Sequence, residues 1–300
     1  MNDDRNLRTI RDFIRFAVTT LEGSSAAYGQ GTESAFDEAC FLVLRALSLP
    51  LNSLDFFADA SVTQDDREKI ISYIDRRAKQ RIPTSYLLNE AWLRDYKFFV
   101  NESVLIPRSH LSDIIFDQID AWLPPQSDVD QVLDLCTGSG CLAILAAERF
   151  PEATITCSDL SAEALQVAQK NINDYELNTQ ISAVESDLFE NIEGKFDLII
   201  SNPPYVDQKS MDQLPPEFKH EPQIALHGGD DGTDLVCQII EAASAYLNDE
   251  GILIMEVGRD REALERRFPE LAFTWIETQS GRDFVFLLTR ADLASGLRSV

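Results

Sequence analysis

Hydrophobic positions in the first 80 residues recur at the spacing of amphipathic helices. The spacing i, i+3, i+4, i+7, i+8, i+11 is followed by Ile10, Phe13, Ile14, Ala17, Val18 and Leu21, which predicts one helix with a single apolar face. The same spacing predicts a helix from about Ser34 to Leu47 and another after Thr63, the expected N-cap, ending near Pro83. We therefore predict a small helical domain over residues 1–82.

The pattern changes after residue 82. Aromatic and β-branched residues between Tyr86 and Val104, interrupted by polar pairs, predict a β-hairpin, and we expect residues 83–108 to be a linker. Helical spacing returns from Ser109 to Leu123 and is broken by Pro124 and Pro125.

From residue 131 the chain alternates between short β-rich runs and helical stretches. The runs are Gln131–Leu135, Thr154–Asp159, Ile181–Ser186, Phe196–Ser201 and Gly251–Val257, and helices are predicted at Ser161–Asn171 and Thr233–Leu247. This alternation predicts a parallel sheet with helices on both faces. Two last runs, Phe273–Thr278 and Phe284–Thr289, are joined by five residues, too few for a crossover helix, so they must pair antiparallel. Residues 109–300 thus predict an α/β domain with a C-terminal hairpin.

Composition fits a folded protein in a reducing compartment. The 300 residues are 44% hydrophobic and 26% charged, close to globular averages. The longest apolar run, Cys141–Ala147, is seven residues, short of the ~18 to 20 that cross a bilayer. The first residues, Met1 to Arg5, do not have the pattern of a signal peptide. Five cysteines, an odd number without C-x-x-C, predict free thiols and no metal site. We expect a cytoplasmic protein without membrane contact.

The charge balance narrows the expected partners. Lys and Arg number 26 against 51 Asp and Glu, a formal net charge of −25. Such a body repels nucleic acid, so DNA binding is not expected, and it attracts a basic protein. Acidity for solubility or a salty habitat is the alternative. Residues 67–81 are a local exception, with six cations against two acids, open to a ribosomal RNA contact or to a solvated helix face.

A glycine-rich turn follows the first predicted parallel strand. It reads Asp134-Leu135-Cys136-Thr137-Gly138-Ser139-Gly140 and opens a helix, so a ligand can approach the backbone and meet free N–H groups. Asp159 lies 21 residues after Gly138 at the end of the next strand, where a carboxylate can accept both ribose hydroxyls. These features predict a nucleoside cofactor. The spacing also fits the dinucleotide fingerprint, so nicotinamide cofactors stay open.

Charge favours one of these cofactors. Asp134 would repel a pyrophosphate but could face the ammonium and sulfonium groups of S-adenosylmethionine. The alternative is an acid that caps the following helix. After the third strand, Asp187 is predicted to meet the adenine amine and Leu188 to stack on the ring.

A second motif, Asn202-Pro203-Pro204-Tyr205, follows the fourth strand, at the edge where open α/β sheets bind ligands. Prolines donate no N–H, so they end strand pairing and leave carbonyls for a ligand. The side-chain oxygen of Asn202 and the carbonyl of Pro203 can accept both protons of a planar NH2 group, and Tyr205 can pack against its plane. A plain Pro-Pro turn is the alternative.

Together the two motifs resemble those of class I methyltransferases that methylate planar nitrogens, in DNA bases or in protein glutamines. The resemblance narrows to the bacterial protein-(glutamine-N5) methyltransferases through the helical front domain and through Ile106-Pro107-Arg108, His220-Glu221-Pro222 and Gly228-Gly229-Asp230-Asp231-Gly232. The branch acting on large-subunit ribosomal protein three is favoured by Tyr28-Gly29-Gln30-Gly31-Thr32, Asp37-Glu38-Ala39 and Pro107-Arg108-Ser109. The release-factor branch instead continues Pro-Arg-Pro-Glu-Thr-Glu.

The resemblance implies a Rossmann-like, S-adenosylmethionine-dependent enzyme that methylates a glutamine amide of a basic ribosomal protein, with residues 1–82 recognising that substrate. It assigns the cofactor to Cys136, Thr137, Gly138, Ser139, Gly140 and Asp159. It assigns binding of the target glutamine to Asn202, Pro203, Pro204 and Tyr205. Asp134, Asp187, Leu188 and Asn202 complete the predicted cofactor set. No strong base is expected, and His110, His220 and His227 are taken as structural.

Rival interpretations remain open. They are methylation of release factors, a DNA amino-methyltransferase, a nicotinamide dehydrogenase and a non-catalytic binding module.

Overall fold

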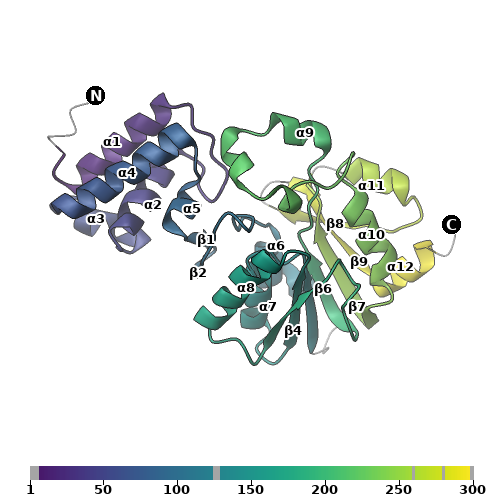
Figure 1. Ribbon diagram of the computed structural model, residues 1–300. Coiled ribbons are helices and arrows are strands. Elements are labelled where there is room, and N and C mark those ends of the chain that lie inside the picture. Colours follow the sequence, from purple (N-terminus) through teal and green to yellow (C-terminus); the bar gives the residue numbers. More distant parts are fainter. Residues whose placement is uncertain (1–6, 124–128, 259–260, 279–280, 298–300) are drawn as a thin grey trace.

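The structure is a computed structural model that describes residues 7–123, 129–258, 261–278 and 281–297. A group of N-terminal helices adjoins a twisted sheet covered by further helices (Figure 1). The predicted break at Pro124 and Pro125, the start of the chain at residues 1–6 and part of the last hairpin turn, residues 279–280, lie outside the described residues.

The N-terminal helices confirm the predicted apolar spacing. Helices α1 (Ile10–Gly23), α2 (Ala35–Ala46) and α4 (Gln64–Gln80) each begin after a hydroxyl N-cap that accepts a backbone N–H three residues on. Short turns, η2 (Leu51–Ser53) and α3 (Leu54–Phe57), lie between α2 and α4. The apolar faces pack into one buried cluster that includes Phe13, Ala17, Leu42, Ile70 and Ile74.

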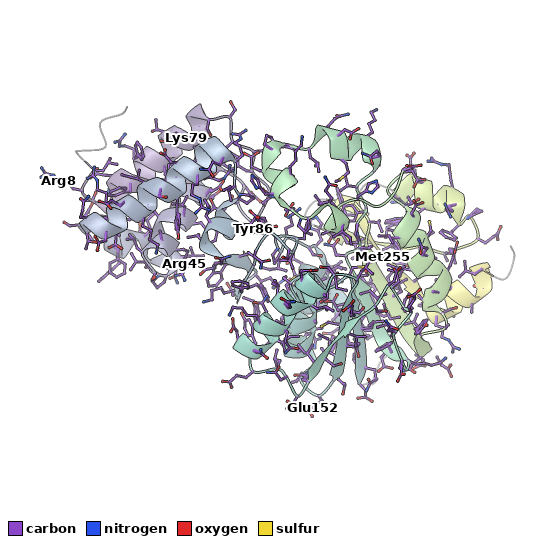
Figure 2. The ribbon with its side chains drawn as sticks, in the orientation of Figure 1. Arg8, Arg45, Lys79, Tyr86, Glu152 and Met255 are labelled. Carbon is purple, nitrogen blue, oxygen red and sulfur yellow. The ribbon has the colours of Figure 1, made fainter. Side chains whose placement is uncertain are left out.

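The linker is folded against both neighbours. The predicted hairpin is confirmed at β1 (Ala91–Leu93) and β2 (Tyr96–Phe98), which pair antiparallel. It is shorter than predicted because residues after Pro83 form α5 (Thr84–Leu88). Figure 2 labels Tyr86 at the junction of the helical group and the sheet. Its buried hydroxyl donates to the carbonyl of Val104 at 2.6 Å.

Seven strands form one mixed sheet in the order β5-β4-β3-β6-β7-β9-β8. The parallel strands are β3 (Gln131–Leu135), β4 (Thr154–Asp159), β5 (Ile181–Glu185), β6 (Phe196–Ser201) and β7 (Leu247–Glu256). The antiparallel pair, β8 (Thr274–Thr278) and β9 (Gly281–Thr289), joins at β7. The predicted fold is confirmed. Because β3 and β6 are neighbours, the glycine turn and the segment from Asn202 leave the sheet side by side.

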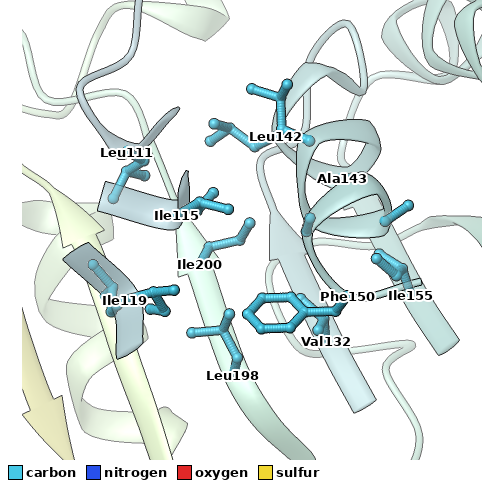
Figure 3. Close-up of a cluster of buried hydrophobic side chains, with 14 of the residues drawn as sticks. Leu111, Ile115, Ile119, Val132, Leu142, Ala143, Phe150, Ile155, Leu198 and Ile200 are labelled. Carbon is cyan, nitrogen blue, oxygen red and sulfur yellow. The ribbon is translucent and has the colours of Figure 1, made fainter. Parts of the chain in front are cut away.

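Helices cover both faces of the sheet, as predicted. On one face lie α7 (Cys141–Arg149), α8 (Ala162–Asp174) and a helical stretch over residues 111–121. On the other lie α10 (Asp234–Ala243), α11 (Arg261–Arg267) and α12 (Arg290–Gly296). Figure 3 shows Leu111, Ile115 and Ile119 over Leu198 and Ile200 of β6.

The helix predicted from Ser109 to Leu123 is divided into three kinds of turn. They are α6 (Leu111–Asp113), a π-helical turn, η3 (Ile114–Gln118), and a 3-10 turn, η4 (Ile119–Ala121). The wider π turn coincides with the buried pair Ile114 and Ile115. Hydrophobic spacing alone does not distinguish such a turn from an α-helix.

A long segment, residues 206–227, separates β6 from α10 and is called the insertion here. It contains α9 (Gln208–Gln213), η5 (Pro216–His220) and η6 (Gln223–Ala225). In Figure 1 it lies between the N-terminal helices and α10 and α11. The sequence pattern did not predict these turns.

Two findings bear on the predictions from composition. All five cysteines are free. In the ranges that the structure describes, no single helix has the length and apolar character to cross a membrane, and Ala35–Ala46 with Leu51–Phe57 reach them only as a pair bent by 98°.

Candidate active site

Two adjoining cavities open at the carboxyl ends of β3 and β6. The glycine-turn cavity, lined by Cys136–Ser139, has about 970 Å³ of space between its atoms, part of it open to solvent. The tyrosine cavity is lined by Pro203 and Tyr205. Asn202 and Arg108 line both, so the two cavities share a wall.

Backbone geometry shapes the glycine turn. Gly138 and Gly140 have φ of 55° and 78°, the region that favours glycine. A Cβ on Gly138 would have no atom within 4 Å, so open space faces that residue. A Cβ on Gly140 would lie 3.1 Å from the Cβ of Ala168, because α8 packs against the turn. Both positions favour glycine because of their positive φ. The missing Cβ leaves room for a ligand at 138 and room for α8 at 140.

Asp159 holds the turn from the neighbouring strand. Its Oδ2 accepts the N–H of Gly138 and its Oδ1 the N–H of Ser161, both at 2.9 Å. Burial raises the pKa of this carboxyl above its ordinary value, although these hydrogen bonds oppose the shift. Asp187 and Leu188 line the same cavity. The structure thus brings both predicted acids to the glycine turn.

Asp134 lies behind the turn rather than on the cavity wall. Its Oδ2 accepts the hydroxyl of Thr137 and, at 3.0 Å, the N–H of Ala143, which are the contacts of a helix cap. Its Oδ1 is buried and has no hydrogen-bond partner among the described residues. Burial raises the pKa of Asp134 to about 7. The capping alternative therefore holds for one oxygen, and the other oxygen is buried without a partner in the described part of the chain.

The predicted cofactor residues largely share one cavity. The glycine-turn cavity is lined by Cys136, Thr137, Gly138, Ser139, Asp159, Asp187, Leu188, Asn202 and Pro204. Asp134 and Gly140 line neither cavity. The prediction missed Leu160 and Ile224, which are 52% and 54% exposed on the same wall. Leu160 directly follows Asp159 and could have been found, whereas Ile224 lies in the insertion without a motif.

Asn202 to Tyr205 form a loop supported from below. The side chain of Asn202 makes no hydrogen bond to any residue that the structure describes, which leaves its oxygen for a ligand. Just after the loop, Val206 donates its N–H to the carbonyl of Leu226 at 2.8 Å. A Cβ on Gly228 would lie 2.7 Å from the carbonyl oxygen of Pro204. The glycine motif that begins at residue 228 therefore packs against this loop.

Tyr205 is held by a residue that the sequence did not single out. Its hydroxyl donates to Oε1 of Glu256, at the end of β7, at 3.1 Å. Oε2 of Glu256 accepts the Ser109 hydroxyl at 2.7 Å and the His110 N–H at 2.9 Å. His110 also lines the tyrosine cavity, and the centre of its ring lies 5.7 Å from that of Phe284. The only signal for Glu256 was its place at a strand end.

Two motifs that carry the family resemblance, Ile106-Pro107-Arg108 and His220-Glu221-Pro222, contact each other in the structure. Arg108 donates through both terminal nitrogens to the buried carboxylate of Glu221, with Nη2 2.8 Å from Oε2. The N–H of Ile106 donates to the same carboxylate at 3.1 Å. Burial would lower the pKa of Arg108, but the charge and hydrogen bonds of Glu221 raise it. On the wall that the two cavities share, the charge of Arg108 is thus neutralised by Glu221.

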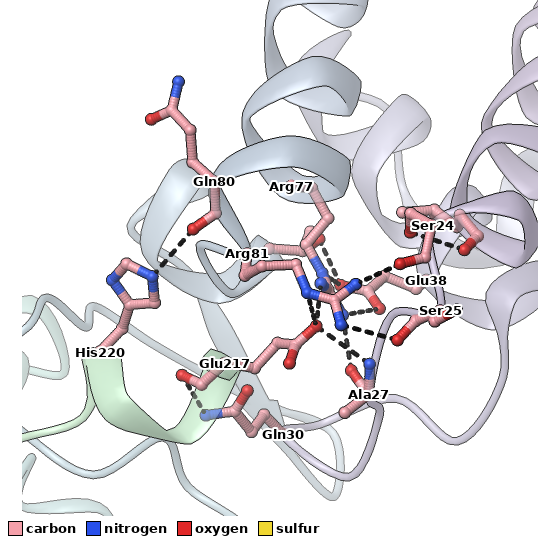
Figure 4. A network of polar contacts seen from close by, with 12 residues as sticks. Ser24, Ser25, Ala27, Gln30, Glu38, Arg77, Gln80, Arg81, Glu217 and His220 are labelled. Carbon is pink, nitrogen blue, oxygen red and sulfur yellow. Dashed lines mark hydrogen bonds and ion pairs between the residues drawn. The ribbon is translucent and has the colours of Figure 1, made fainter. Parts of the chain in front are cut away.

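The insertion is docked on the N-terminal helices through Glu217 (Figure 4). Its Oε1 accepts from Nη1 of Arg77 and from the N–H of Ala27, both at 2.9 Å, and pairs with Nε of Arg81 at 3.1 Å. Arg77 also binds Glu38, with Nε 2.6 Å from Oε1. Because the insertion lines both cavities, the helical domain contacts the active site through it.

Most cations of residues 67–81 have partners within the fold. Arg67 and Lys69 donate to the carbonyls of Leu7 and Ala46, and Lys79 pairs with Asp75. Arg77 and Arg81 bind Glu217. The charges of Arg77, Lys79 and Arg81 are thus balanced by carboxylates within the fold.

The ionisable groups of the glycine-turn cavity suit a ligand with a positive end. Asp159 and Asp187 stand on its wall, and Asp134 lies behind with an unpartnered oxygen. Arg108 on the same wall is already paired with Glu221. A pyrophosphate would meet these carboxylates without an unpaired arginine or lysine on the described wall. The residues fit S-adenosylmethionine and disfavour a dinucleotide.

Comparisons with known proteins point the same way. A family model, the methyltransferase small domain, matches residues 120–229. The ribosomal protein uL3 glutamine methyltransferase of Neisseria meningitidis serogroup B is 46% identical over 289 residues, 96% of this chain and 95% of the relative. That of Bordetella pertussis is 43% identical over 293 residues, 97% of this chain and 98% of the relative. The solved hMettl16 catalytic domain, in complex with MAT2A 3'UTR hairpin 6, covers 77% of this chain and 84% of its own, with a TM-score of 0.50 and 14% identity, a likeness of fold alone.

Proposed function

The chain belongs to the family of the ribosomal protein uL3 glutamine methyltransferases, and we propose that it methylates the side-chain amide nitrogen of a glutamine in uL3, using S-adenosylmethionine. The observation that carries this proposal is the place of Asn202. Asn202 lines both the glycine-turn cavity and the tyrosine cavity, so one residue can touch both a methyl donor and an acceptor.

The glycine-turn cavity is assigned to the methyl donor. Cys136 to Ser139 would follow its amino-acid end, Asp159 its ribose, and Asp187 and Leu188 its adenine. Gly140 acts indirectly, by letting α8 support the turn. The cofactor supplies a methyl group made electrophilic by the sulfonium. Asp134 lies behind the wall with one oxygen that has no partner among the residues described, and in its ionised form it favours a ligand that carries positive groups.

The tyrosine cavity is assigned to the target glutamine. An amide nitrogen is a weak nucleophile because its lone pair is delocalised into the carbonyl. The Asn202 oxygen and the Pro203 carbonyl can accept both its N–H groups, which orients the nitrogen and stabilises the positive charge that develops on it. Pro204 keeps the loop free of strand pairing, and Tyr205 packs against the amide plane. The nitrogen gains a methyl group and loses one proton to water, so the chain needs no strong base.

Charge distribution supports a basic protein as the substrate. Residues 1–82 carry 11 Lys and Arg against 13 Asp and Glu, so all but two of the 25 net negative charges belong to residues 83–300. Asp207 and Glu256 stand on the tyrosine cavity itself. A field of this sign speeds the encounter with a cationic protein and opposes DNA. A ribosomal RNA contact through residues 67–81 is a weaker part of the proposal, because three of the six cations are paired with carboxylates of the fold.

The three regions have separate tasks in this proposal. Residues 1–82 recognise the substrate and hold the insertion, residues 83–108 link, and residues 109–300 catalyse. The buried docking of Glu217 supports the second task of the helical region. Five free thiols and a ribosomal substrate support a cytoplasmic location without membrane contact.

The decisive experiment compares acceptors. The protein is incubated with methyl-labelled S-adenosylmethionine and, in separate reactions, with purified uL3, a release factor or DNA. We expect label in uL3, recovered as N5-methylglutamine after proteolytic digestion, and none in the other two. Label in the release factor would establish the alternative acceptor, and no transfer to any protein would refute the proposal. Replacing every glutamine of uL3 by glutamate, one at a time, identifies the target.

A further inference from the structure

Glu256 connects two parts of the tyrosine-cavity wall that lie far apart in the sequence. Its side chain is buried at the end of β7 and lines the cavity. One carboxylate oxygen accepts from Tyr205, and the other accepts from Ser109 and His110. Burying a carboxylate is costly unless donors satisfy it, and here three donors do so.

Tyr205 is constrained at two places as a result. At its tip, the hydroxyl donates to Glu256 at 3.1 Å. At its edge, the ring lies against Gly258, where a Cβ would come within 2.8 Å of Cδ2. A hydrogen bond to a charged acceptor is stronger than one between neutral groups, so the carboxylate is well suited to fix the ring.

The same carboxylate also contributes charge at the cavity. The other ionisable groups on this wall are Asp207, His110 and Arg108, and Arg108 is neutralised by Glu221. The wall is therefore acidic on balance. Positive charge that develops on a methylated amide nitrogen is stabilised in such surroundings.

We propose that Glu256 is a positioning residue for methyl transfer, which fixes Tyr205 against the target amide and ties it to the Ser109–His110 segment. This inference rests on the proposed function, because the target amide is taken to bind in the tyrosine cavity. Glu256 itself does not touch the reacting atoms. It acts through the orientation of the tyrosine ring.

Glu256→Gln tests the role with little change of shape. The amide oxygen can still accept from Ser109 and His110, while the charge is lost and the Tyr205 hydroxyl faces an NH2 donor in place of the carboxylate acceptor. We expect kcat to fall by about 10-fold or more, the usual effect of one hydrogen bond to a charged group. The dissociation constant for S-adenosylmethionine and the thermal midpoint should stay close to those of the wild type. A selective loss of kcat is a readout that a purely structural role would not give.

Asp197→Asn is the matched control. Asp197 also accepts three hydrogen bonds, from the N–H groups of Asp130 and Gln131 and from the side chain of Asn248. It lies near the amino end of β6, whereas Glu256 lies at the carboxyl end of the neighbouring parallel strand β7. We expect wild-type kcat for this variant. If Glu256→Gln retains the same kcat as the control, the inference is wrong.

A double-mutant cycle with Tyr205→Phe separates positioning from other effects. If the two side chains act through one hydrogen bond, the double variant loses no more than the worse single variant. Losses that multiply would refute the link. Should Glu256→Gln show no cooperative melting, Tyr205→Phe decides alone, because phenylalanine keeps the ring, and near-normal kcat would overturn the inference. A wild type that cannot label uL3 refutes the proposed function instead.

Discussion

Arg77 of α4 and Glu217 of the insertion form a buried ion pair, with Nη1 2.9 Å from Oε1. Hydrogen bonding and the charge of its two carboxylate partners raise the pKa of Arg77 despite burial, and the backbone N–H of Ala27 helps to lower that of Glu217. The pair is the main polar contact through which a helical domain holds a loop of the active site. Its removal should therefore affect both the stability of the protein and the order of the insertion.

Glu217→Gln should lower the free energy of unfolding by roughly 3 kcal/mol or more, because Arg77 and Arg81 lose the charge of a buried partner. Chemical denaturation measures the loss. Limited proteolysis should then cut within residues 207–215. Asp75→Asn, on the same helix, breaks the exposed pair with Lys79 and should cost less than about 1 kcal/mol. Equal losses in the two variants would contradict the docking role.

Asn202→Ala should reduce turnover by about 100-fold or more, the scale found for one oriented stabiliser of transition-state charge. Because the glycine turn keeps its other contacts, the affinity for S-adenosylmethionine should change little. Single-turnover transfer and a binding titration measure the two effects. Asn178→Ala, at an exposed position, serves as the control. Near-normal transfer by the Asn202 variant would remove that residue from the mechanism.

Asp134 should give the protein a distinct pH dependence. Its carboxyl ionises near pH 4 when unfolded and near pH 7 when folded, so the folded state binds more protons in between. Its contribution to the unfolding free energy therefore falls as the pH rises from about 4 to 7, and levels off above that. Asp134→Asn abolishes this dependence, so the variant should gain stability over the wild type toward pH 8.

Binding of a cationic ligand should favour the ionised form of Asp134 over the protonated form. Positive charge near Asp134 favours its ionised form, so wild-type affinity for S-adenosylmethionine should rise between pH 6 and 8. Isothermal titration at both pH values measures the change. The Asp134→Asn variant controls for titration of the ligand itself. Parallel pH profiles for the two proteins would show that Asp134 does not sense the cofactor.

Two glycines of one turn should fail in different ways. Gly138→Ala places a methyl group in open space at the cavity, so its main effect should be a lower affinity for S-adenosylmethionine. Gly140→Ala places it 3.1 Å from the Cβ of Ala168, so the thermal midpoint should fall more than for Gly138→Ala. Both variants carry the cost of a positive φ, about 1 to 2 kcal/mol. Melting curves with and without cofactor separate the outcomes.

The sequence predicted the sheet well because its strands are short apolar runs with clear ends. Strands β3, β4 and β6 have the predicted bounds. The motif residues also met as predicted, since β3 and β6 are neighbours whose carboxyl ends share an edge. Asp134 shows the limit of this reasoning. Its position in the motif was clear, but whether a side chain faces a cavity or caps a helix depends on packing.

Contacts made by single polar residues were out of reach. Glu217 lies in a segment without periodicity or motif, and Glu256 stands at the end of a predicted strand. Their partners Arg77 and Ser109 are 140 and 147 residues away. Nothing local in the sequence indicates such a pairing. The insertion escaped prediction for the same reason, because its short turns depend on docking rather than on their own propensity.

The docking of the insertion has a consequence for how the protein is made. Arg77 and Glu217 are 140 positions apart, and synthesis proceeds from the amino end. The helices that present Arg77 can thus be complete, with Glu38 as its interim counterion, well before Glu217 is translated. The N-terminal helices can therefore form first, and the insertion can dock on them only afterwards. The part of the active-site wall that the insertion contributes therefore cannot form before residues 206–227 have been translated.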